Sequence, residues 1–125
     1  MNNSTKKLTA KEEEVMSHFW RLGALFVREL LGEYDDPKPH FNTLSTVVRG
    51  LEEKGYIAHR AFGSTHQYYP IISLDQFRAL TLKDVIGRYY DNSISSVVST
   101  LVESREISTE ELRELLDLID REGRL

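Results

Sequence analysis

The chain has 125 residues, with 16 Lys and Arg against 20 Asp and Glu, a formal net charge of −4, and no cysteine. This length fits one domain, or one domain with a tail that is marginal alone. The absence of cysteine excludes disulfides, thiolate metal sites and cysteine nucleophiles. No apolar run reaches the length of a bilayer span, and no hydrophobic segment follows the opening letters MNNSTKK, so we expect a cytoplasmic protein without a signal peptide or membrane insertion.

The negative charge is uneven along the chain. Residues 1–72 carry nine Lys and Arg and nine Asp and Glu, whereas residues 73–125 carry seven against eleven. Within the first part, the stretch from 38 to 66 has only two acidic residues, Glu52 and Glu53. Its basic residues are Lys38, His40, Arg49, Lys54, His59, Arg60 and His66. This distribution predicts a local basic surface on a neutral module.

Two helices are predicted before residue 35. Thr9 followed by Glu12 is a capping box, and the apolar positions that follow have helical spacing: Val15, Met16, Phe19 and Trp20. Gly23 is expected to end this helix. FVRELLGEY at 26–34 predicts a second, shorter helix whose apolar face is formed by Phe26 or Val27, Leu30, Leu31 and Tyr34. DDPKP at 35–39 then ends the helical segment.

A third helix and two strands follow. The helix is expected over 41–54, with Gly55 as its stop and five residues on the buried side: Phe41, Leu44, Val47, Val48 and Leu51. YIAHRAF and HQYYPII alternate as two antiparallel strands joined at GST. The predicted fold class is mainly α with a small β-hairpin, and residues 1–73 form a winged helix-turn-helix.

Residues 74–125 show only helical spacing, in three amphipathic segments. Ser73 with Gln76 and Ser108 with Glu111 are further capping boxes. So short a tail rarely buries enough surface to fold alone, so we expect a three-helix dimerisation domain and a homodimer. The apolar rows that supply its core and interface are Val85, Ile86, Tyr89, Ile94, Val97, Val98, Leu101, Leu112, Leu115, Leu116 and Ile119.

The open face of the predicted third helix carries residue types that read DNA grooves. Asn pairs with adenine, Arg pairs with guanine, and Ser and Thr bond to bases or phosphates. Phosphate contacts are expected from Lys38 and Lys54 and from the hairpin. The predicted site for double-stranded operator DNA comprises Asn42, Thr43, Ser45, Thr46, Arg49, Lys38, Lys54, Arg60, Ser64 and His66.

Other functions remain open from the residues alone. Some winged helices bind only proteins, and Tyr89 and Tyr90 beside apolar helices leave room for a small ligand in a dimer interface. The sequence shows no catalytic constellation, no Gly-rich phosphate loop and no His-x-x-x-His pair. We therefore expect a protein that is not an enzyme and has no metal or cofactor.

Three segments, in order, resemble the BlaI/MecI penicillinase-repressor family: EVMSHFW at 14–20, TLSTVVRGLEEKG at 43–55, and YYP at 68–70. The resemblance covers nearly the whole chain. It implies a cytoplasmic dimer with an N-terminal winged helix and a C-terminal helical dimerisation domain. It also implies repression of beta-lactamase or related resistance operons. A two-fold pair of reading helices should bind inverted half-sites, so we expect a palindromic operator.

The chain departs from the family at several positions. The better-known members have Lys and Arg where this chain has Asn42 and Ser45, and Arg49 lies one place before the usual Arg, where Gly50 stands. The operator sequence of the family is therefore not transferable to this chain. The copper-responsive members use C-terminal cysteines, which this chain lacks.

The resemblance also bears on induction. In penicillin-responsive members a membrane sensor protease leads to a cut at an Asn-Phe bond. The matching place here is Thr100-Leu101, so the sequence does not predict induction by cleavage, although a sensor protease acting upstream remains a candidate partner.

Overall fold

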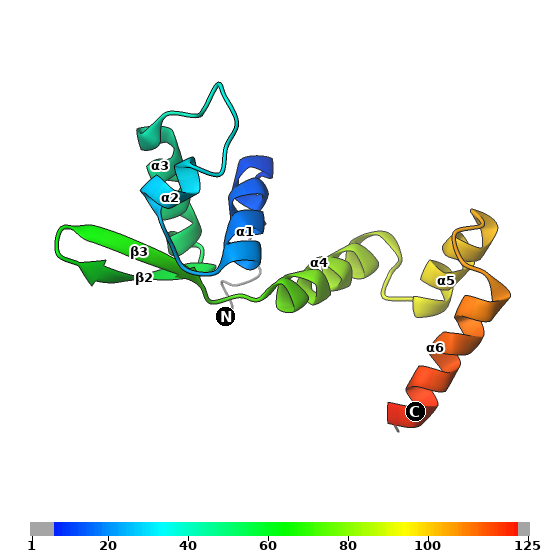
Figure 1. Cartoon of the computed structure of the whole chain (residues 1–125). Helices are drawn as coiled ribbons and strands as arrows, with labels where there is room; N and C mark the ends of the chain where they lie inside the picture. The colour runs from blue at the N-terminus through cyan, green and yellow to red at the C-terminus, as the bar shows by residue number, and fades with distance from the viewer. Residues whose placement is uncertain (1–6, 123–125) are drawn as a thin grey trace. The chain divides into compact units, whose positions relative to one another are not determined.

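The computed structural model describes residues 7–122, and the MNNSTK segment considered for a signal peptide lies outside them. The fold is mainly helical with a small antiparallel sheet, which confirms the predicted fold class. The elements are α1 (Ala10–Leu22), β1 (Leu25–Phe26), α2 (Val27–Leu31), α3 (Phe41–Glu53), β2 (Ile57–Phe62), β3 (Thr65–Pro70), α4 (Leu74–Tyr89), α5 (Ile94–Glu103) and α6 (Thr109–Glu122) (Figure 1). The chain divides into two compact units between Leu80 and Thr81.

The predicted capping box begins α1. The Thr9 hydroxyl accepts the Glu12 amide at 3.1 Å, and the Glu12 carboxylate accepts the Thr9 amide at 2.8 Å. Gly23 ends the helix at a φ of +87°, a value that costs a residue with a Cβ far more than glycine. Both helix ends are therefore where the sequence predicts them.

The second helix is shorter than predicted. Phe26 is not helical: it pairs with Gln67 in the two-residue strand β1, and its amide donates to the Glu29 carboxylate at 3.0 Å. Tyr34 follows the helix, which has ended at Leu31. The sheet consequently has three strands in the order β1-β3-β2, where the sequence predicted only a hairpin.

In α3 the predicted buried face is mostly confirmed. Leu44, Val48 and Leu51 are buried, and Val47 is half-buried. The prediction for Phe41 is wrong, because its side chain is 44% exposed. As the first helical residue, Phe41 has the spacing of the core face but lies beyond the end of the core.

The hairpin of β2 and β3 projects from the three-helix part of the first unit (Figure 1). Phe62 pairs with Thr65, so the turn is the two residues Gly63 and Ser64. Gly63 has a φ of +63°, at the position that a type II′ turn gives to glycine.

The core of the first unit is contributed by α1, α2, α3 and the sheet. Its buried apolar residues are Leu8, Val15, Met16, Phe19, Leu25, Leu30, Leu44, Val48, Leu51, Tyr56, Ile57 and Tyr68. Trp20 closes one side: its indole N–H donates to the Ile72 carbonyl at 2.9 Å, and its ring lies 5.1 Å from that of Phe77. The beginning of α4 therefore packs as part of the first unit.

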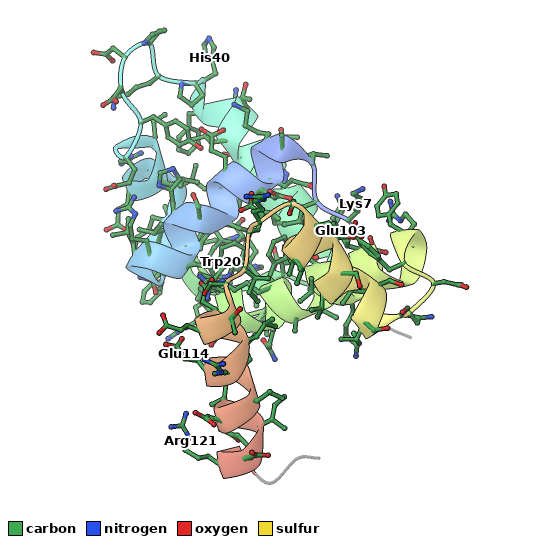
Figure 2. All side chains as sticks on the ribbon, turned by 90° about the vertical axis from the view of Figure 1, so that its right-hand side faces the viewer. Lys7, Trp20, His40, Glu103, Glu114 and Arg121 are labelled. Carbon is green, nitrogen blue, oxygen red and sulfur yellow. The ribbon has the colours of Figure 1, made fainter. Side chains whose placement is uncertain are left out.

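The second unit comprises the end of α4 with α5 and α6. The Ser108 and Glu111 capping box is present at α6, and the Ser73 and Gln76 box at α4, as predicted. No residue from 81 to 122 is buried. Figure 2 shows Glu114 and Arg121 extending from α6. Within residues 7–122, no helix is long and apolar enough to cross a membrane.

Candidate nucleic-acid interface

The exposed face of α3 carries a connected row of polar side chains. The Thr46 hydroxyl donates to the Asn42 carbonyl at 3.0 Å, and the Arg49 guanidinium donates to the Thr46 hydroxyl at 3.4 Å. Asn42, Thr43, Thr46 and Arg49 are exposed, and Ser45 is half-buried. The predicted reading residues therefore share one face, with Arg49 supported by Thr46. Figure 2 labels His40 at the start of this helix.

The hairpin holds its predicted side chains through ring contacts. The Arg60 guanidinium lies 4.7 Å from the centre of the Tyr69 ring. His66 stacks on His59 with ring centres 4.1 Å apart, and the His59 ring nitrogen lies 2.6 Å from the Glu52 carboxylate of α3. Glu52 and His59 thus connect the position of His66 to α3.

Two of the residues predicted to contact phosphates, Lys38 and Lys54, form bonds within the protein, and Lys38 is exposed. The Lys54 ammonium lies 2.6 Å from the Glu12 carboxylate and 2.9 Å from the Lys7 carbonyl. The Lys38 ammonium donates to the carbonyls of Leu31 and Tyr34. The bonds of Lys38 are local, to carbonyls seven and four residues before it, whereas Lys54 pairs with Glu12, 42 residues away.

The pairing with Lys54 changes the pKa of the Glu12 carboxyl group. Burial alone would raise the pKa of Glu12, but hydrogen bonds from Lys54 and the Thr9 amide, with the nearby ammonium charge, lower it below its ordinary value. Glu12 is therefore held as a carboxylate, and Lys54 belongs to the packing of α1 against α3.

A concavity of about 420 Å³ lies between the start of α2, the start of α3 and the hairpin turn. It is lined by Phe26, Val27, Arg28, Glu29, Phe41, Ser64, Thr65, His66 and Tyr68. Only Ser64 and His66 among these were predicted as site residues. The other lining residues could not be predicted from a local sequence pattern, because they come from separate segments of the chain, 26–29, 41 and 64–68.

The predicted interface residues of the second unit fall into two groups. The row is half-buried at Val85, Ile86, Val97, Val98, Leu112 and Ile119, and exposed at Tyr89, Ile94, Leu101, Leu115 and Leu116. Tyr89 is 69% exposed and Leu116 57%. Leu82, Val102 and Leu118 are exposed apolar residues that the sequence reasoning did not select.

The Thr100-Leu101 bond lies inside α5. Thr100 has its hydroxyl bonded to the Ser96 carbonyl at 3.2 Å, and the helix continues to Glu103. Among the residues that the structure describes, no group of three or more His, Asp or Glu could hold a metal ion.

Three packed helices, a small antiparallel sheet and a projecting hairpin define a winged helix. Residues 8–121 match the penicillinase repressor family, and the chain belongs to that family of transcriptional repressors. The predicted family resemblance is thereby confirmed.

Several curated proteins are similar over nearly their whole length. Methicillin resistance regulatory protein MecI of Staphylococcus aureus (strain N315) is 25% identical over 122 residues, covering 97% of this chain and 99% of that protein. MecI of Mammaliicoccus sciuri is 26% identical over 124 residues, with the same coverage. The penicillinase repressor of Bacillus licheniformis is 24% identical over 119 residues, covering 91% of this chain and 90% of the other.

Among solved structures, the chain resembles that of TrmBL2, an archaeal chromatin protein whose structure shows a novel mode of DNA binding. The TM-score is 0.44 at 22% identity, and the match covers 91% of this chain and 37% of that one.

Proposed function

We propose that this repressor binds a palindromic DNA operator as a homodimer in the cytoplasm and reads it through α3. The observation that carries the proposal is the exposed row of Asn42, Thr46 and Arg49 on α3, in a chain of the penicillinase repressor family. The regulated genes that this family membership favours are those of beta-lactam resistance or related functions.

The chemistry of the row suits base reading in the major groove. An Asn amide pairs bidentately with adenine, and an Arg guanidinium with guanine. Thr46 accepts a hydrogen bond from Arg49 and thereby favours one direction of its long side chain. Arg60 and Ser64 on the hairpin are suited to phosphate contacts, which position a protein without specifying sequence.

The proposal of a homodimer rests on the exposed apolar residues of the second unit. Four large apolar side chains of this unit are exposed in the single chain: Tyr89, Ile94, Leu115 and Leu116. A second copy of the unit would remove them from water, and burial of apolar surface stabilises by about 25 cal/mol per Å². Joining two reading helices makes the second half-site contact intramolecular. A two-fold pair of helices reads inverted half-sites about one DNA turn apart, ~34–36 Å, or a multiple of it.

Selection of bound DNA from a random pool tests the proposal, and a palindromic consensus is the expected result. On that consensus, Asn42→Ala and Arg49→Ala should each cost about 1–3 kcal/mol and relax one base position. Arg21→Ala on α1, which removes an exposed Arg paired with Glu33, is the matched control. If neither reading variant changes affinity or preference, α3 is not the reader.

A further inference from the structure

The concavity beside α3 brings together apolar and polar groups from three elements. Phe26, Val27 and Tyr68 contribute apolar surface, Phe41 comes from the start of α3, and the remaining lining residues are polar: Arg28, Glu29, Ser64, Thr65 and His66. Phe41, Arg28 and the three hairpin residues are exposed, so the concavity is open to solvent. Phe41 also directly precedes the reading residue Asn42.

The lining holds one cation, Arg28, and one carboxylate, Glu29, and the bonds that these two groups form differ. Arg28 forms no ion pair with any carboxylate of the described residues 7–122, while the neighbouring Glu29 carboxylate accepts the Phe26 amide at the start of its own helix. His66 is stacked against His59 and held beside the concavity. The Thr65 hydroxyl donates to the Phe62 carbonyl at 2.9 Å, whereas the Ser64 hydroxyl has no such bond to a described residue.

We propose that this concavity seats the sugar–phosphate backbone of one DNA strand as it passes from the groove read by α3 toward the hairpin turn. Arg28 and His66 contact its phosphates, and Phe41 packs against a deoxyribose. This inference rests on the proposed function. It adds Arg28 and Phe41 to the interface, two residues that the basic and polar pattern of α3 and the hairpin does not include.

The chemistry of a DNA strand matches this lining better than that of an enclosed small molecule. A deoxyribose–phosphate repeat is apolar on the sugar and anionic on the phosphate, as the lining requires. Small-molecule pockets usually bury most of their ligand, whereas this concavity opens beside the reading residues. Phosphate contacts are independent of sequence, so Arg28 should add affinity to every site alike.

The test measures operator affinity of the full-length protein at several salt concentrations, for the wild type, Arg28→Ala and Arg28→Lys. Loss of one phosphate contact should reduce the slope of log K against log salt by about 0.9, so the affinity ratio of wild type to Arg28→Ala should shrink about 3- to 4-fold between 50 and 200 mM salt. Arg28→Lys should restore most of the slope, because it keeps the charge. The selected consensus should not change in either variant.

Arg21→Ala is the control for removal of an exposed Arg, and thermal melting shows that each variant is folded. The inference would be overturned if Arg28→Ala had the wild-type slope of log K against log salt. If Arg49→Ala still lost sequence discrimination, the proposed function would nevertheless stand. A wild type that selects no consensus would defeat both. Benzoate serves as a small-anion probe. If benzoate released the wild type but not Arg28→Ala from DNA, and the salt slope of Arg28→Ala were unchanged, the concavity would bind a small anion and the inference would be overturned.

Discussion

Glu12 near the start of α1 and Lys54 at the end of α3 form an ion pair of 2.6 Å, with side chains only 11% and 25% exposed. The same carboxylate oxygen accepts the Thr9 amide of the capping box. The Glu12 carboxylate thus caps the N-terminus of α1 and also links α1 to the C-terminal end of α3. A Cβ added at Gly50 would lie 3.3 Å from the other oxygen of Glu12.

Glu12→Gln should lower the free energy of unfolding at neutral pH by about 1–3 kcal/mol, because it removes the charge from a partly buried hydrogen-bonded pair. The folded pKa of Glu12 lies below its ordinary value of 4.5, so the stabilisation is present above that pH and is lost as pH falls through the folded pKa. Urea unfolding at pH 7 and pH 3 measures the difference. The control is the exposed Glu53→Gln, and an equal loss at both pH values would contradict the assignment.

Gly50→Ala tests the close approach of Glu12 to α3. Alanine in a helix interior normally gains about 0.5–1 kcal/mol over glycine, but here the added methyl group meets a carboxylate held by Lys54 and Thr9. We expect little gain, or a loss, in the wild type and the normal gain in a Glu12→Ala background. Denaturant unfolding of the four proteins in this cycle provides the measurement. Equal effects of Gly50→Ala in both backgrounds would show that the contact does not constrain Gly50.

Tyr34 has a buried hydroxyl without a hydrogen-bond partner among the described residues. Burial, with a smaller contribution from the Glu14 charge, raises its pKa to about 12. Because an unsatisfied buried polar group costs about 1–3 kcal/mol, Tyr34→Phe should leave stability unchanged or raise it by about 1 kcal/mol. Thermal unfolding measures this change. A clear loss of stability would mean that the hydroxyl has a partner.

Leu115→Glu should separate the proposed dimer without unfolding the chain. The side chain is exposed in the single chain, so a carboxylate there meets water in a monomer, whereas a dimer interface would bury it unpaired. Val98 is half-buried, and Val98→Asp should instead disrupt the second unit itself. Sedimentation and circular dichroism distinguish these outcomes. Arg113→Glu, on the same helix but outside the apolar row, is the control, and an unchanged dimer in Leu115→Glu would place the interface elsewhere.

The chain should remain intact in cells exposed to a beta-lactam. The Thr100-Leu101 bond replaces the Asn-Phe bond expected from the family resemblance, and it lies within α5 with its backbone in helical geometry. Immunoblots before and after exposure decide the matter, with total protein as loading control. A fragment of about the first hundred residues, appearing together with derepression, would establish induction by cleavage.

Features that depend on neighbouring residues were predictable from the sequence. The capping boxes at Thr9, Ser73 and Ser108 each join residues three apart, so the pattern contains both partners. Gly23 and Gly55 stop their helices with positive φ, a conformation that glycine adopts readily. The apolar spacing of α3 identified Leu44, Val48 and Leu51 as buried, because periodicity shows which side of a helix is apolar. It does not show where along the helix the core ends, and Phe41 is exposed.

Only the tertiary structure decided which polar groups are available and which segments meet. From the sequence, Lys54 is expected to be a free surface cation, but in the structure it pairs with Glu12, 42 residues away. Phe26 has helical spacing, yet pairing with Gln67 draws it into the sheet. The concavity with Arg28 and Phe41 likewise exists only where α2, α3 and the hairpin come together. Long-range pairing competes with local preference through packing and hydrogen bonds that no short window of sequence contains, so the lining of this site required the fold.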